Sequence, residues 1–263
     1  KSIFSLLIGP KNSILTILTP SYNICIIMSK KFYHNKDKYF MIFAKIDFIN
    51  LLPFHIYIKK NINSSQLKAS IEYKKSYPSA INKKFKQRVV DSAFISSIAS
   101  RNEKYLDFGI VARNEVLSVL LIPGIEEKDY QSDTSNALSK VLNLKGKVII
   151  GDKALNFYYE NPQIEKIDLA KEWQNKYHLP FVFAVLCFNS NKKELYKLTK
   201  NFNKKYIKIP QYILEQYSKR SGVSKKHILE YLKRIDYTLG IKEKRALKLF
   251  LKLTKEKGLK WQL

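Results

Sequence analysis

The chain has 263 residues, of which 45% are hydrophobic, and a formal net charge of +26 at pH 7. This apolar content is sufficient for a full hydrophobic core and excludes an intrinsically disordered chain. Only six of the 48 basic residues are arginines, although bidentate recognition of bases and phosphates favours Arg, so the charge indicates a solvated, lysine-rich surface rather than a nucleic-acid-binding protein.

Cysteine and histidine usage gives no sign of a metal site. The two cysteines, Cys25 and Cys187, lie far apart in the sequence and predict neither a disulfide framework nor a thiolate site. No histidine pair has the i, i+4 spacing of a zinc motif, in a chain whose histidines are His34, His55, His178 and His227.

Residues 1–41 differ from the chain that follows. Their apolar runs are interrupted at Pro10, Lys11 and Pro20 before a membrane-spanning length is reached, and no small-residue cleavage site follows them. Met41 stands directly before the first expected strand. We therefore expect the native protein to begin at or near Met41, with residues 1–41 a non-native or disordered extension.

From residue 42 to residue 187, strand and helix patterns alternate. Strands are expected at 42–49, 67–73, 89–95, 108–111, 117–122, 147–150 and 181–187, and helices after Pro53 and at 78–87, 135–142, 153–159 and 169–177. This alternation predicts an α/β protein with a mostly parallel sheet and right-handed crossovers.

The segment from 191 to 263 shows helical periodicity and no clear strand. It holds 21 basic and 6 acidic residues, and its lysines are dispersed around apolar stripes, as on solvated helix faces. Ser224 is a candidate N-cap for a helix that Gly240 would end, and a further helix is expected at 241–257.

Polar residues interrupt or follow several of the apolar strands. Asn50 follows the first strand, where its amide either offers a donor and an acceptor to a ligand or caps the next helix. Ser118 lies in an apolar run, so its hydroxyl needs a hydrogen-bond partner in the backbone or in a ligand. No histidine is near Ser118 in the sequence, so we expect a hydrogen-bonding role and not a nucleophile.

Further candidate site residues lie at the starts of two expected helices. The segment Ser132–Ser135 either binds a carboxylate or phosphate through hydroxyls and free N–H groups, or forms a capping box. Gly151 permits a close backbone approach after its strand, and Asp152 is either an N-cap or the nearest candidate base.

Taken in order, six short motifs resemble the chorismate dehydratase family of the futalosine route to menaquinone. They are Asp47-Phe-Ile-Asn-Leu-Leu-Pro53, Leu117-Ser-Val-Leu120, Asp133-Thr-Ser135, Ile150-Gly-Asp-Lys-Ala-Leu155, Asp168-Leu-Ala with Trp173, and Leu179-Pro-Phe-Val-Phe-Ala184. The resemblance covers about residues 42–263. It implies a cytoplasmic protein with a two-lobed type II periplasmic-binding-protein-like fold, a cleft between the lobes and a helical C-terminal tail. Ser96 and Ser97 lie where related sequences vary, so no role carries over to them.

The resemblance also implies a reaction, the loss of water from chorismate to give 3-[(1-carboxyvinyl)oxy]benzoate. It implies catalytic residues Asn50, Ser118 and Asp152, and substrate-binding residues Ser132, Thr134, Ser135, Gly151 and Phe181. We expect Asn50 and Ser118 to orient the substrate and the leaving group, and the base to be either Asp152 or a carboxylate of the substrate. No metal or organic cofactor, nucleic-acid partner or membrane insertion is expected.

The domain organisation follows from the strands at Ser118 and Phe181, which flank the middle βα units as hinge strands should. We expect one discontinuous lobe from 42–116 and 186–263, and an inserted lobe from 117–185. The alternatives are a solute-binding protein that captures a small carboxylate, which would normally need export, and another futalosine-pathway enzyme of the same fold.

Overall fold

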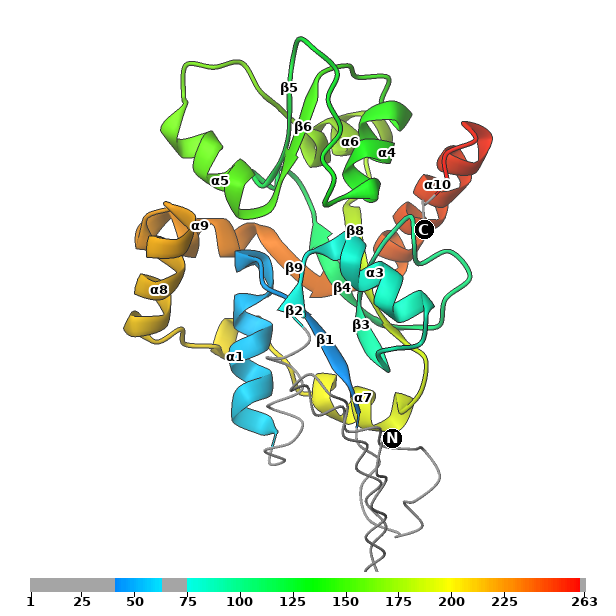
Figure 1. Ribbon diagram of the computed structural model, residues 1–263, viewed down its shortest axis with the longest axis vertical. Coiled ribbons are helices and arrows are strands. Elements are labelled where there is room, and N and C mark those ends of the chain that lie inside the picture. The colour runs from blue at the N-terminus through cyan, green and yellow to red at the C-terminus, as the bar shows by residue number, and fades with distance from the viewer. Residues whose placement is uncertain (1–40, 63–74, 261–263) are drawn as a thin grey trace, which may run out of the picture. The chain divides into compact units, whose positions relative to one another are not determined.

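The computed structural model describes residues 41–62 and 75–260. The extension expected at residues 1–41 therefore lies, apart from Met41, outside the described residues, and so does the strand expected at 67–73. Where the chain is described, it forms an α/β protein with two sheets and a largely helical C-terminal region, which confirms the expected fold class (Figure 1).

The larger sheet has six strands in the order β2-β1-β3-β8-β4-β9. These are β1 (Phe43–Ile46), β2 (Lys75–Ser76), β3 (Ser92–Ser96), β4 (Tyr105–Ala112), β8 (Phe181–Phe188) and β9 (Ile235–Thr238). The strand β1 is parallel to β2 and to β3, whereas β8 is antiparallel to β3 and β4, and β9 is antiparallel to β4.

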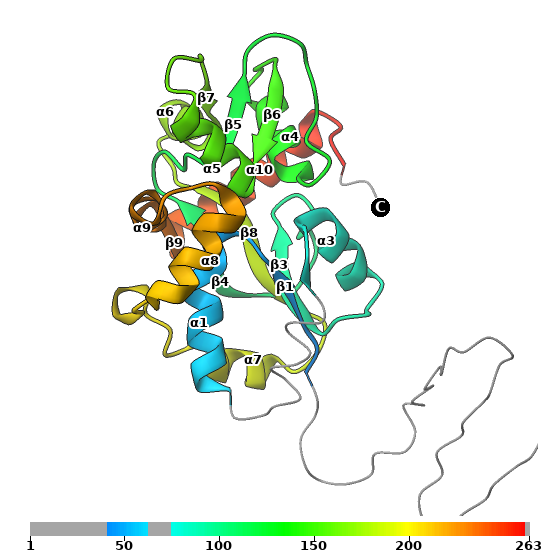
Figure 2. The same cartoon turned by 60° about the vertical axis from the view of Figure 1, so that its left-hand side comes forward.

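The smaller sheet has three antiparallel strands in the order β6-β5-β7, namely β5 (Val119–Ile122), β6 (Lys147–Ile150) and β7 (Ile167–Asp168). Figure 2 shows it at one end of the described structure, with the six-stranded sheet below it. The expectation of a mostly parallel sheet was wrong, because within the described residues only two strand pairs, β1–β2 and β1–β3, are parallel and the other five are antiparallel. The strand β8 enters the larger sheet after the chain has passed through the smaller one, and it runs back between β3 and β4.

The helices are positioned by local signals that the sequence carries. Pro53 and Pro78 stand at the starts of their helices, and the Ser132 and Ser224 side chains accept N-cap hydrogen bonds, so the Ser224 cap is confirmed. The elements are η1 (Ile49–Leu51), α1 (Leu52–Asn61), α3 (Pro78–Lys86), α4 (Asp133–Val141), α5 (Gly151–Glu160), α6 (Leu169–Tyr177), α7 (Lys192–Thr199), η2 (Lys204–Tyr206), α8 (Gln211–Ser221), α9 (Lys225–Arg234) and α10 (Ile241–Glu256).

The C-terminal segment differs from the expectation in one element. The helix α9 ends at Arg234, the chain continues as the strand β9, and Gly240 is the N-cap of α10 instead of the end of a helix. Buried Ile235 and Tyr237 alternate with more exposed neighbours, which is the period-two pattern of an edge strand. Pairing with β4 outweighs the helical periodicity of the surrounding segment.

One continuous hydrophobic core underlies both sheets. Trp173 of α6 and Phe250 of α10 pack on Phe181 of β8, with ring centroids 5.2 Å and 5.1 Å from that of Phe181. These contacts place β8 where elements of both sheets meet. The lobe boundaries at 116/117 and 185/186 remain a prediction, and β8 runs through the second of them. Within residues 41–62 and 75–260, no helix is long and apolar enough to cross a bilayer.

Candidate active site

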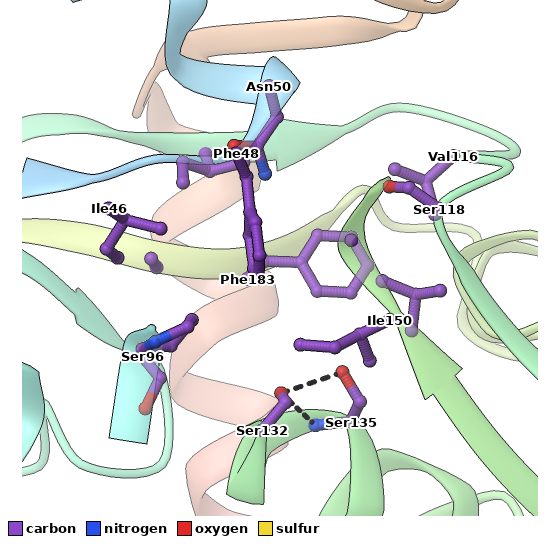
Figure 3. A pocket seen from close by; sticks show the side chains of 15 residues that line it. Ile46, Phe48, Asn50, Ser96, Val116, Ser118, Ser132, Ser135, Ile150 and Phe183 are labelled. Carbon is purple, nitrogen blue, oxygen red and sulfur yellow. Dashed lines mark hydrogen bonds between the residues drawn. The ribbon is translucent and has the colours of Figure 1, made fainter. Parts of the chain in front are cut away.

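A small cavity of about 60 Å³ lies where elements of the two sheets face each other (Figure 3). Its walls are apolar and aromatic, with a few neutral polar groups. The lining residues are Ile46, Phe48, Asn50, Pro78, Ser96, Ile110, Val116, Ser118, Val119, Ser132, Ser135, Ile150, Gly151, Phe183 and Ala184. None of these residues is ionisable, so the cavity offers a ligand only neutral hydrogen-bond donors and acceptors.

The structure brings five of the eight expected site residues to this cavity, and they are Asn50, Ser118, Ser132, Ser135 and Gly151. The other three, Thr134, Asp152 and Phe181, do not line it. Each of those three is engaged by other parts of the protein.

Asn50 lies in the short helix η1, directly before α1. Its side chain makes no capping hydrogen bond, because the caps are Phe48 for η1 and Leu51 for α1. Its main-chain oxygen accepts a hydrogen bond from the Tyr237 hydroxyl, which fixes the segment. The Asn50 Oδ1 atom is buried and has no hydrogen-bond partner among the described residues. The Asn50 side chain therefore does not cap a helix, and it keeps an unpaired acceptor at the cavity.

Ser118 lies directly before β5 and is 3% exposed. Its hydroxyl is 2.8 Å from the hydroxyl of Tyr231, a buried residue of α9, and its main-chain oxygen accepts from Gly151 N at 2.8 Å. The turn before it has Leu117 at φ 61° and is held by the Asp168 carboxylate, which accepts from Val116 N at 2.8 Å. The hydroxyl thus has a protein partner and also faces the cavity.

Of the hydroxyls at the start of α4, two lie at the cavity and one bonds to another loop. Ser132 Oγ accepts from Ser135 N at 3.2 Å and lies 2.9 Å from Ser135 Oγ, and both side chains line the cavity. Thr134 Oγ1 instead accepts from Ile98 N at 3.1 Å and is buried. Successive helical residues point about 100° apart, so neighbouring hydroxyls cannot all face one ligand. Thr134 anchors the loop after β3, while Ser132 and Ser135 remain at the cavity.

Gly151 and Asp152 are the first two residues of α5, and they contact different neighbours. Gly151 has φ +67°, and a Cβ there would lie 2.9 Å from the Phe48 ring, so glycine permits both the backbone conformation and the close packing of Phe48. The Asp152 carboxylate accepts from Ile49 N at 2.9 Å and from Arg220 Nη2 at 2.8 Å, and it does not cap α5.

The surroundings of Asp152 explain its orientation. Burial raises the pKa of its carboxyl group, against the opposing effects of the Ile49 hydrogen bond and the Arg220 charge. Arg220, at the end of α8, also donates to Asp47 Oδ2 at 2.8 Å. This network joins the start of α5 to the segment that carries Phe48 and Asn50, and Asp152 faces the network instead of the cavity.

Phe181 is 1% exposed and is enclosed by Trp173 and Phe250. The aromatic residue of β8 that lines the cavity is Phe183, on the same face of the strand two residues further on, with its ring centroid 4.7 Å from that of Phe181. Because residues two apart on a strand face the same side, the sequence could have identified Phe183 as a candidate together with Phe181.

Sequence reasoning also missed Tyr231, Arg220 and Ser96. Tyr231 and Arg220 lie in helical patterns whose local sequence gives no indication of contacts 113 and 68 residues away. Ser96, the last residue of β3, had a signal of the same kind as Asn50, a polar residue at the end of an apolar strand. Among the described residues, no group of three or more His, Cys, Asp and Glu is arranged to hold a metal ion.

Known proteins resemble this chain in sequence and in fold. A chorismate dehydratase of Campylobacter jejuni is 50% identical over 221 residues, which represent 82% of this chain and 98% of that protein. A family model described as "Menaquinone biosynthesis" matches residues 127–256.

Two solved structures are similar at low identity. The crystal structure of an Archaeoglobus fulgidus protein has a TM-score of 0.57 at 16% identity and covers 82% of this chain and 97% of that one, which is a likeness of fold. A Candida albicans protein described as having the generic periplasmic binding protein structural fold has a TM-score of 0.41 at 15% identity, over 84% of this chain and 97% of that one. The sequence match to the Campylobacter protein extends over nearly its whole length, and this chain therefore belongs to the chorismate dehydratase family.

Proposed function

We propose that this protein is a chorismate dehydratase, a hydro-lyase that converts chorismate to 3-[(1-carboxyvinyl)oxy]benzoate for menaquinone biosynthesis in the cytoplasm. The observation that carries the proposal is the 50% identity to the Campylobacter enzyme over 98% of its length. The chemistry of the cavity supports it independently.

The cavity suits a ring with oxygen substituents. Phe48, Phe183 and Ile150 supply apolar and aromatic surface for the ring, and Ser132 and Ser135 present hydroxyls beside the N-terminus of α4. Hydroxyls and free N–H groups at a helix N-terminus favour a carboxylate. The net charge of +26 attracts a dianionic substrate from a distance.

The elimination breaks two bonds on neighbouring ring carbons. A proton leaves the carbon that bears the enolpyruvyl ether, hydroxide leaves the adjacent carbon as water, and the new double bond makes the ring aromatic. No carboxylate or imidazole of residues 41–62 and 75–260 lines the cavity, and Asp152 is engaged by Ile49 N and Arg220. We therefore assign the base to a carboxylate of the substrate, with Asn50 and Ser118 orienting the substrate and the departing hydroxyl.

A cavity of about 60 Å³ has room for only a few water molecules, so chorismate must widen it on entry. Phe48 is the side chain best placed to move, because it packs on Gly151 across the cavity, between the β1 segment and the start of α5. We propose that this contact separates when the substrate enters.

The test is incubation of the purified protein with chorismate, followed by chromatography of the products. We expect 3-[(1-carboxyvinyl)oxy]benzoate to accumulate over many turnovers, with Asn50→Ala as the impaired control. Stoichiometric binding of chorismate without product would instead support a solute-binding protein. Absence of both binding and product would favour another futalosine-pathway enzyme of this fold.

A further inference from the structure

Ser96 ends β3 at the wall of the cavity, and a single buried side chain holds both its main chain and its hydroxyl. Asn82 of α3, which is 1% exposed, accepts a hydrogen bond from Ser96 N at 3.1 Å through Oδ1. Its Nδ2 lies 2.6 Å from Ser96 Oγ. Figure 3 shows Ser96 on the wall of the cavity, across from Ser118.

The hydrogen bond from Ser96 N determines how the Asn82 amide is oriented towards the Ser96 hydroxyl. A main-chain N–H can only donate, so the oxygen of the Asn82 amide must face Ser96 N and its NH₂ group must face Ser96 Oγ. The NH₂ group likewise only donates, so the Ser96 hydroxyl is an acceptor in this pair. Its own proton is not used by Asn82, and no second partner for Ser96 Oγ exists in the described part of the chain.

Ser96 thus differs from the other cavity hydroxyls. Ser132 and Ser135 lie within hydrogen-bonding distance of each other, and Ser118 lies beside Tyr231, so in each pair one hydroxyl can donate its proton to the other. The partner of Ser96 Oγ is an NH₂ group, which cannot accept a proton from it. The hydroxyl of Ser96 has an uncommitted proton at the wall of the cavity. Because no Lys or Arg among the described residues lines that cavity, an anionic group in it depends on neutral donors.

We propose that Ser96 Oγ donates a hydrogen bond to a carboxylate oxygen of the substrate, and that Asn82 is a positioning residue that directs this proton into the cavity. This inference rests on the proposed function and adds to it a substrate-binding residue and the group that orients it. It assigns a role to a strand-end serine for which the family resemblance provided none.

The test compares steady-state kinetics with chorismate in three variants. Ser96→Ala removes the donor and should raise KM roughly tenfold to a hundredfold, the loss of a hydrogen bond to a charged group, with a smaller change in kcat. Asn82→Asp keeps the shape and the acceptor for Ser96 N, but its second oxygen takes up the Ser96 proton, so KM should rise by a similar factor. Ser100→Ala is the matched control, because the Ser100 hydroxyl is buried in the same loop and donates to Ser97 O at 2.9 Å; its KM should be unchanged.

The outcomes separate this inference from the function on which it rests. Lack of turnover by the wild-type protein would refute the proposed function. If the wild type turns over chorismate but folded Ser96→Ala has an unchanged KM, the role of Ser96 is refuted and the proposed function is not. An unchanged KM in Asn82→Asp would refute the positioning role of Asn82. If Ser96→Ala does not fold, Ser96→Cys replaces it, since a thiol keeps the volume but is a weak donor, and a wild-type KM there counts against the proposal.

Discussion

The pairing of Ser118 with Tyr231 allows the role of the Ser118 hydroxyl in catalysis to be separated from its role in stability. The two hydroxyl oxygens are 2.8 Å apart, and Tyr231 is 2% exposed. Burial raises the pKa of Tyr231, so its hydroxyl stays protonated at neutral pH. Ser118→Ala removes the partner of Tyr231 and, at the same time, a hydroxyl that lines the cavity.

The stability cost follows from the buried phenol. Ser118→Ala leaves the Tyr231 hydroxyl without a partner, which costs about 1–3 kcal/mol. For a protein of this size, 1 kcal/mol corresponds to about 2–4 °C in Tm, so a central value of about 2 kcal/mol lowers Tm by about 4–8 °C. Tyr231→Phe should cost less, about 1 kcal/mol, because the Ser118 hydroxyl that it leaves unpaired can turn towards the cavity.

The activities of the two variants should differ in the same direction as their stabilities, but by a much larger factor. Ser118→Ala should lower kcat for chorismate by about tenfold to a thousandfold if its hydroxyl stabilises the transition state. Tyr231→Phe keeps that hydroxyl and should retain activity to within about threefold. The measurements are calorimetric Tm values and steady-state kinetics of both single variants and the double variant, in which the stability effects should couple by about 1 kcal/mol.

Two results would contradict this reasoning. Wild-type kinetics in Ser118→Ala would restrict the serine to a structural role as the partner of Tyr231. An equal loss of activity in Tyr231→Phe would show that the hydroxyl pair, and not the Ser118 hydroxyl alone, supports catalysis.

Three further predictions concern the neighbouring residues. If a substrate carboxylate is the base, Asp152→Asn should keep kcat within about tenfold of the wild-type value, whereas Asn50→Ala should lower kcat by at least about a hundredfold. Near-total inactivity of an Asp152→Asn variant that folds and binds substrate would instead identify Asp152 as the base. Gly151→Ala should lower the stability by about 1–3 kcal/mol, because its φ of +67° disfavours a side chain and the new Cβ would lie 2.9 Å from the Phe48 ring, and an unchanged Tm would contradict this. His55 is fully buried, and burial lowers its pKa from 6.5 to about 3, so the unfolded chain takes up a proton below pH 6.5 that the folded chain does not. Stability should therefore fall by roughly 2 kcal/mol between pH 7 and pH 5, and His55→Leu should flatten this part of the profile in chemical denaturation; an equal slope in the variant would count against it.

The sequence by itself determined the α/β class, most helix starts and the residues at the ends of the strands that meet at the cavity. Pro53, Ser132 and Ser224 act within one turn of their own position, so their effect is readable locally. Asn50 and Ser118 were found because a polar side chain in or after an apolar strand needs a partner. The ordered motifs led to the chorismate dehydratase family, which the match to the Campylobacter enzyme confirms.

Only the tertiary structure decided which way these side chains face and with whom they pair. Asp152 is directed to Ile49 and Arg220, 103 and 68 residues away, and Ser118 is directed to Tyr231, 113 residues away. The strand β9 likewise forms in a helical context because β4 offers it an unpaired edge. Caps and periodicity arise from neighbours in the chain and are therefore encoded locally. The partner of a buried polar group is whichever donor or acceptor the packing of distant elements brings within about 3 Å, and no local pattern specifies that distance.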